Sequence, residues 1–258
     1  RPGMSEDFNK KNMQLLSLKN NFKKTYIGMG YYNTITPSVI LRNILENPGW
    51  YTAYTPYQPE VSQGRLEMLM NFQQMIIDLT GMEIANASLL DESTAAAEAM
   101  MMAFKIKKNS KFTFCVQNKC HPQTLSVLKT RAEPLGIKII YDTPDNDTFG
   151  CLIQNPDTLG EIADLDKLIK SNKQKEIISI IASDIMSLIL MQSPGKFKAD
   201  IVIGSSQRFG VPMGLGGPHA AFFATLNDHK RMLPGRLIGV SVDRRNKRSY
   251  RMALQTRE

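Results

Sequence analysis

The feature that most constrains the fold is a series of short apolar segments separated by helix-like stretches. Residues rich in Ile, Val and Phe occupy 111–117, 137–141, 150–154, 176–182, 200–204 and 220–225. Apolar and polar residues hardly alternate within them, which is typical of strands buried on both faces. Helical candidates lie between several of them, at 122–134 and 164–173. This order predicts an α/β fold with a mostly parallel, doubly wound sheet.

Two further helices are predicted ahead of these segments. Residues 65–80 carry apolar side chains at helical spacing and are expected to stop at Gly81. Residues 94–108 are rich in Ala and Met, which favour helices, and either Asp91 or Ser93 can cap them.

The first quarter of the chain has a different composition. Residues 1–20 are polar and predict an irregular opening, whereas 26–63 are rich in Gly, Pro and Tyr around a short helical run at 39–45. Such density favours an ordered arm with many turns. We therefore expect an N-terminal arm over 1–64 and a large α/β domain over 65–258.

Composition excludes several classes of protein. The 258 residues include 32 Lys and Arg against 24 Asp and Glu, a net charge of +8, and only three cysteines. A disulfide scaffold is excluded and a reduced, intracellular compartment is expected. No apolar stretch is long enough to span a membrane. Because the chain starts at Arg1 and its opening resembles no signal peptide, we expect it to be part of a longer protein.

Two polar residues follow predicted strands, at the edge where open α/β sheets bind ligands. Asp184 follows the run 177–182, and a carboxylate there can pair with a pyridinium nitrogen or accept backbone hydrogen bonds in a turn. His121 follows the 111–117 strand, where its ring can stack on a cofactor, transfer a proton, or pack on a helix N-terminus. The residue types alone leave these alternatives open.

Other motifs are better explained by structure than by chemistry. Ser93 and Thr94 at a helix N-terminus can hold a phosphate, but capping is the commoner use. The Gly-rich turn at 214–218 leads into a strand and so matches no nucleotide-binding loop. The three histidines lack metal-ligand spacing, and no metal site is expected. The basic residues of 230–257 lack a nucleic-acid module, so a solvated face or one docking an acidic protein is expected.

Taken together, several stretches closely resemble the glycine cleavage system P protein family. They are 26–32 (YIGMGYY), 51–64 (YTAYTPYQPEVSQG), 83–99 (EIANASLLDESTAAAEA), 120–124 (CHPQT), 204–221 (GSSQRFGVPMGLGGPHAA), 233–240 (LPGRLIGV) and 253–258 (ALQTRE). The resemblance covers the chain from about Lys24 onward and is to the N-terminal half, or subunit 1, of the family. It implies the large domain of a fold-type-I, pyridoxal phosphate-dependent transferase and, for the whole enzyme, decarboxylation of glycine with transfer of its aminomethyl group to the lipoylated H protein.

The resemblance also implies which residues to examine. Aligning Phe209, Pro212 and the 216–218 turn with the catalytic half places Gln207 where the cofactor lysine stands there, whereas Lys196 and Lys198 are out of register. An amide cannot form a Schiff base. We therefore expect the partner half to hold pyridoxal 5'-phosphate. In the same register a remnant cofactor site is expected at Ser93, Thr94, His121, Asp184 and Gln207.

A second group, the polar-aromatic loop, is expected to complete the partner half's active site. Its members are Tyr54, Tyr57, Gln58, Glu60, Ser62 and Gln63. Two functions remain open: a non-covalent half of the decarboxylase, active only with the lysine-bearing half, or a non-catalytic half that docks that half or the H protein. The expected partners are the C-terminal half or subunit 2, the lipoylated H protein and glycine, with no nucleic acid and no membrane. Bacterial cytoplasm is favoured, and the mitochondrial matrix also fits.

Overall fold

A seven-stranded mixed sheet forms the centre of the molecule in the computed structural model, which describes residues 3–51, 55–214 and 216–255. The strand order is β1-β7-β6-β5-β4-β2-β3, and the pairs from β6 to β3 are parallel. β7 runs antiparallel to both of its neighbours, β6 and β1. The strands are β1 (Ile84–Ala85), β2 (Thr113–Val116), β3 (Lys138–Tyr141), β4 (Thr148–Asn155), β5 (Ile178–Ser183), β6 (Ile201–Ser205) and β7 (Ala221–Thr225).

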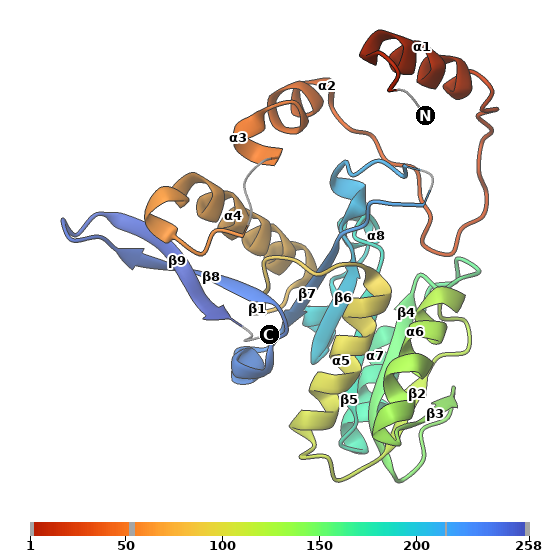
Figure 1. The fold of residues 1–258 in the computed structure, drawn as a ribbon. Helices are drawn as coiled ribbons and strands as arrows, with labels where there is room; N and C mark the ends of the chain where they lie inside the picture. Colours follow the sequence, from red (N-terminus) through yellow and green to blue (C-terminus); the bar gives the residue numbers. More distant parts are fainter. Residues whose placement is uncertain (1–2, 52–54, 215, 256–258) are drawn as a thin grey trace.

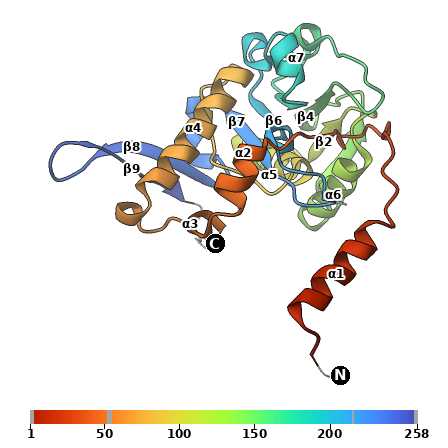
Figure 2. The same cartoon turned by 90° about the horizontal axis from the view of Figure 1, so that it is seen from above.

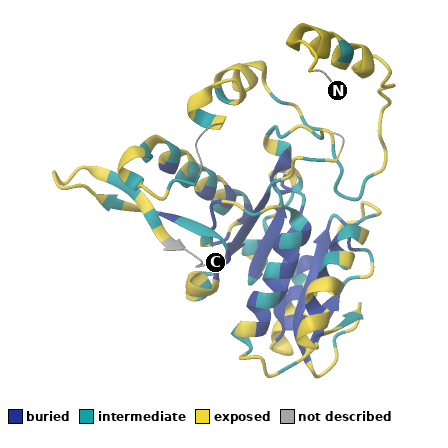
Figure 3. Ribbon diagram, viewed as in Figure 1, coloured by how far each residue is buried: buried dark blue, intermediate teal, exposed yellow. Residues whose placement is uncertain are grey.

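Helices cover both faces of this sheet, so the predicted layers are confirmed (Figures 1 and 2). α5 (Glu92–Ile106) and α6 (Pro122–Ala132) pack on one face with Phe114, Phe149 and Ile180. α4 (Gln63–Thr80), α7 (Leu165–Gln174) and the short α8 (Ser187–Leu190) pack on the other. Figure 3 shows the buried residues concentrated in the central strands. Apolar runs without alternation therefore marked strands covered on both sides.

The helix limits follow local sequence signals. α4 ends at Gly81, whose φ of 69° is left-handed and suits glycine. Asp91, rather than Ser93, caps α5 by accepting the Thr94 amide at 2.7 Å, so this helix begins at Glu92, two residues earlier than predicted. Single turns of 3₁₀ helix occur at Pro59–Val61, Glu133–Leu135, Pro194–Phe197 and Gln207–Phe209, with a longer 3₁₀ stretch at Asn227–Met232.

The prediction of an irregular opening was wrong. Residues Glu6–Ser17 form α1, capped by Ser5, which accepts the Phe8 amide at 3.3 Å. The helix has no buried residue and lies apart from the sheet (Figure 2). Further along the arm, α2 (Ser38–Ile40) continues into a π-helical turn at Leu41–Leu45 and is followed by α3 (Pro48–Tyr51).

The basic C-terminal stretch forms a separate two-stranded hairpin, β8 (Arg236–Val242) and β9 (Arg248–Gln255). It projects beside α4 (Figure 1). Gln73 fastens the base of the hairpin, because its amide oxygen accepts the Ile238 amide at 2.8 Å and its amide nitrogen donates to the Ile238 carbonyl at 3.1 Å. The turn at its tip is exposed and carries four basic residues, namely Arg244, Arg245, Lys247 and Arg248.

Candidate functional site

Polar side chains gather at the carboxyl edge of the parallel strands, where two cavities adjoin. The larger one, of about 180 Å³, lies between the start of α5, the start of α6 and residues 30–31 of the arm. The smaller one, of about 10 Å³, has no more room than a single water needs. Glu92, His121 and Ser205 line both. We call the residues that line these two cavities the carboxyl-edge site.

An ion pair fills the middle of the site. Asp184, directly after β5, accepts Arg208 Nε at 2.7 Å and Arg208 Nη2 at 2.8 Å, so the fork of the guanidinium takes both carboxylate oxygens. The side chains are only 15% and 23% exposed. Tyr32 from the arm closes over the pair, with the Arg208 guanidinium carbon 4.0 Å from its ring centre. Burial raises the pKa of Tyr32, which stays a neutral phenol.

Glu92 supplies a second carboxylate that sequence reasoning missed. Its oxygens accept Gln154 Nε2 at 3.1 Å and the Ser205 amide at 3.2 Å. Burial raises the pKa of Glu92 to about 7, since these hydrogen bonds do not fully compensate the lost solvation. The available signal was an acid next to the Asp91 cap, just before the predicted helix over 94–108. An acid there is sufficiently explained by its favourable interaction with the helix dipole.

His121 is buried and lies directly before α6. This position corresponds to the alternative in which the histidine packs on a helix N-terminus. Its Nδ1 lies 2.9 Å from the Thr158 hydroxyl, and burial lowers its pKa, which keeps the ring neutral. Ser93 is also buried and shares a hydrogen bond with Thr124 at 3.1 Å. The structure brings Ser93 and His121 to the same cavity. Thr94 supplies its amide to the Asp91 cap instead.

Gln207 follows β6 in the sequence and is almost fully buried. Its amide nitrogen donates to the Pro218 carbonyl at 3.0 Å, and its backbone amide donates to the Ser205 hydroxyl at 3.2 Å. It lines the smaller cavity together with Asp184. Four of the five residues predicted as a remnant cofactor site therefore line these two cavities.

The arm forms one wall of the carboxyl-edge site. Gln123 Nε2 donates to the Met29 carbonyl at 2.6 Å, and the Thr34 hydroxyl donates to the Val211 carbonyl at 2.9 Å. Gly30 has a φ of 85°, and a Cβ there would come within 3.3 Å of the His121 ring. A glycine is therefore needed for the arm to approach the histidine this closely.

The polar-aromatic loop lies elsewhere, between α4 and the hairpin. The Gln63 side chain donates to the Tyr250 carbonyl and accepts the Tyr250 amide, both at 2.8 Å, so it holds β9 in place. Tyr57 is exposed, and its hydroxyl accepts Arg236 Nη2 at 3.2 Å. Gln58 and Glu60 are exposed and Ser62 is half-buried. Tyr54 lies outside the described residues, and none of the described members lines the two carboxyl-edge cavities.

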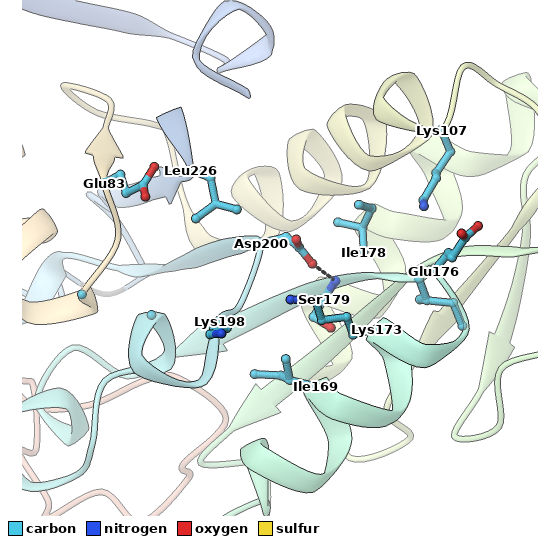
Figure 4. A pocket seen from close by; sticks show the side chains of 13 residues that line it. Glu83, Lys107, Ile169, Lys173, Glu176, Ile178, Ser179, Lys198, Asp200 and Leu226 are labelled. Atoms are coloured by element: carbon cyan, nitrogen blue, oxygen red, sulfur yellow. Dashed lines mark hydrogen bonds between the residues drawn. The ribbon is translucent and has the colours of Figure 1, made fainter. Parts of the chain in front are cut away.

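A cavity of about 600 Å³ lies at the opposite, amino edge of the sheet (Figure 4). Asp200 lines it beside Lys107, Lys173 and Lys198, and its carboxylate accepts the Ser179 amide at 2.8 Å. Lys173 and Lys198 are exposed, and no ion pair joins the three lysines to a carboxylate in the described part of the chain.

Comparison with solved structures defines the class of protein. A putative O-acetylhomoserine (thiol)-lyase from Campylobacter jejuni, a pyridoxyl-lysine structure, superposes with a TM-score of 0.50 at 18% identity over 63% of this chain and 41% of that one. The chain therefore has the fold-type-I α/β fold of pyridoxal phosphate-dependent enzymes. Glycine decarboxylase (P-protein) of the glycine cleavage system, in inhibitor-bound form, superposes with a TM-score of 0.92 at 33% identity, over 98% of this chain and 60% of that one.

Sequence comparison then gives the family. The model of the glycine cleavage system P-protein family matches residues 1–258, and the chain belongs to this family. It is 59% identical over 252 residues to a glycine dehydrogenase (decarboxylating) from Teredinibacter turnerae and 56% identical over 261 residues to one from Photobacterium profundum. These matches cover 95% and 100% of the chain but only 26% and 27% of the relatives. The chain thus spans about a quarter of their length.

The residues of the carboxyl-edge site do not fit pyridoxal phosphate. Arg208 already occupies both oxygens of Asp184, so a pyridinium nitrogen would have to displace a two-point ion pair. Asp91 and Glu92 line the larger cavity and would repel a phosphate dianion. Gln207 offers no amine.

Among the described residues no helix is long and apolar enough to cross a membrane, and no group of three metal-ligating side chains occurs.

Proposed function

We propose that this chain is the N-terminal portion of a glycine decarboxylase of the glycine cleavage system. In this proposal the assembled enzyme decarboxylates glycine and passes the aminomethyl group to the lipoylated H protein. The chain is active only together with the C-terminal half or subunit 2, which binds pyridoxal 5'-phosphate through a lysine. The observation that carries the proposal is Gln207, a buried amide that is held by the Pro218 carbonyl. By the resemblance to the family, this is the position at which the catalytic half has the cofactor-binding lysine.

The position of the cofactor gives a direct test. Borohydride reduction of the full-length enzyme loaded with pyridoxal phosphate converts a lysine-bound cofactor into a stable pyridoxyl label. We expect peptide mapping to find the label on a lysine outside residues 1–258. A label on any lysine of residues 1–258, Lys196 and Lys198 included, would contradict the proposal.

The polar-aromatic loop is proposed to complete the partner half's active site. The exposed side chains of Tyr57 and Glu60 support this role, because neither is needed to cover the core. We expect Tyr57→Ala and Glu60→Ala to lower glycine decarboxylation by the assembled enzyme while assembly is retained. Gln63→Ala is unsuitable for this purpose since Gln63 holds β9.

The second candidate function is a non-catalytic half that only docks the catalytic half or the H protein. The exposed basic tip of the hairpin favours a surface for an acidic partner. If the Tyr57 and Glu60 variants keep full decarboxylation, this second function replaces the first. Binding of the lipoylated H protein that weakens as salt is added would support docking through the basic surface.

Since the relatives named above come from bacteria, we propose that the enzyme works in the bacterial cytoplasm.

A further inference from the structure

Two of the three cysteines are direct neighbours in the sheet. Cys115 on β2 and Cys151 on β4 are paired across the parallel strands, and both thiols are free. Paired residues of neighbouring strands point to the same face, and the strands lie about 4.8 Å apart. This separation falls within the range of about 4.4–6.8 Å between the Cα atoms of disulfide-bonded cysteines.

Cys115, which is fully buried, and Cys151, which is 8% exposed, are among the residues that line a cavity of about 250 Å³ between the sheet and α7. Gln117, Asp142 and Asn172 supply polar wall atoms. The buried side-chain oxygen of Gln117 has no hydrogen-bond partner in the described part of the chain.

The cavity is separate from the carboxyl-edge site. Cys115 and Cys151 pack with α7 in the core on one face of the sheet. Ser93 and Thr124, which line the larger carboxyl-edge cavity, belong to α5 and α6 on the other face. The dithiol therefore lies outside the residues assigned to the proposed function.

The two thiols differ in acidity. The interaction between the two thiols holds the pKa of Cys115 below its usual value and raises that of Cys151. Cys115 is therefore the better nucleophile and Cys151 the resolving thiol. Cys120 differs from both, because burial raises its pKa to about 12.

We propose that Cys115 and Cys151 form a dithiol site for hydrogen peroxide, which oxidises the pair to a cross-strand disulfide. Cys115 loses its proton, and the thiolate attacks one peroxide oxygen. The O–O bond breaks, and the hydroxide that leaves takes up the proton lost by Cys115 to become water. Cys151 then attacks the resulting sulfenic acid, the S–O bond breaks, and a second water leaves with the Cys151 proton. The dithiol loses two electrons and the peroxide gains them.

Peptide mapping of the full-length enzyme tests the site. The protein is treated with hydrogen peroxide while native, remaining thiols are alkylated, and trypsin separates the cysteines into the peptides 112–119, 120–129 and 139–167. We expect peptides 112–119 and 139–167 to be joined, two hydrogens lighter than their sum, and to separate on addition of dithiothreitol. Peptide 120–129 should stay fully alkylated.

Matched variants sharpen the result. Cys151→Ala should abolish the joined peptide, whereas Cys120→Ala should leave the joined peptide unchanged. The proposal is overturned if the native wild-type enzyme gives no joined peptide, if joining requires urea, or if Cys120 is oxidised as fast as the pair. The wild-type measurement decides the question even where a variant does not fold.

Discussion

The two edges of the central sheet each hold a half-buried carboxylate, but in different surroundings. At the carboxyl edge, Glu92 accepts two neutral donors and burial raises its pKa to about 7. At the amino edge, burial also raises the pKa of Asp200, but the nearby charges of His229, Lys173 and Lys107 oppose the rise. The amino-edge cavity is the larger of the two, about 600 Å³ against 180 Å³.

Cavity volume and the clustering of polar groups therefore point to different edges of the sheet. Exposed lysines at the amino edge are flexible and well solvated, so they neither fix a ligand nor gain much from one. The carboxyl edge instead combines a two-point ion pair, a buried histidine and a desolvated acid within one group of contacts. Groups whose pKa values are shifted together in this way are typical of functional sites.

The strongest test of the comparison is removal of the central cation. Arg208→Ala leaves Asp184 mostly buried without its counter-charge, so we expect the local structure to lose about 3 kcal/mol. Tyr32 also loses the group on which it packs, which should loosen the arm. Hydrogen exchange of the full-length enzyme, followed in the peptides that cover β5, β6 and residues 28–36, measures both effects.

The double variant Arg208→Met with Asp184→Leu provides the control, since it removes both charges and keeps apolar volume. Replacing both partners is expected to cost much less than removing one. If Arg208→Ala exchanges at the wild-type rate, the pair is not what holds the carboxyl edge together.

The sequence predicted the layers well and the site only in part. Parallel strands covered on both faces leave long apolar runs, which is why β4 and β5 were predicted to within two residues at each end. α1 was missed because it has no buried face, although the Ser5 cap and the acids Glu6 and Asp7 marked its start. β1 has only two residues, which is too short for any pattern.

The contacts within the site depend on sheet order, which no local pattern contains. Asp184 and Arg208 are 24 residues apart and meet because β5 and β6 are neighbours. Gln63 and Tyr250 are 187 residues apart in sequence. Gln63 was predicted to belong to the loop that completes the partner's active site, and in the structure its side chain holds β9 through these hydrogen bonds. Glu92 was overlooked because an acid in the first helical turn has a sufficient explanation in the helix itself.

A second test uses the pH dependence that Glu92 imposes. Its pKa is raised from 4.5 to about 7 in the folded protein, so the folded state binds the proton more tightly than the unfolded state. Its contribution to stability is complete below about pH 4.5 and is lost as the pH rises through 7. Glu92→Gln removes the charge but keeps only one of the two acceptor oxygens, so its stability relative to wild type should rise between pH 5 and pH 8, by up to about 3 kcal/mol. Urea unfolding of both proteins between pH 5 and 8.5 measures the difference.

Asp200→Asn provides the comparison at the amino edge. The same sign applies, because burial also raises the pKa of Asp200, but the hydrogen bond from the Ser179 amide and the charges of Lys173 and Lys107 oppose the shift. We expect a smaller gain than for Glu92→Gln under the same conditions, complete at a lower pH. An equal or larger gain for Asp200→Asn would remove the distinction between the two edges.

The smallest expected effect is at the amino-edge lysines. Lys198 is exposed and makes no ion pair in the described part of the chain, so Lys198→Ala should change the free energy of unfolding by less than about 0.5 kcal/mol. The left-handed φ of 65° at this position is as unfavourable for Ala as for Lys, so the backbone contribution cancels. Urea unfolding with Lys173→Ala as a parallel variant measures the effect. A loss comparable to that of Arg208→Ala would mean that the amino-edge cavity is held together by charge, as the carboxyl edge is, and both edges would then need to be examined as sites.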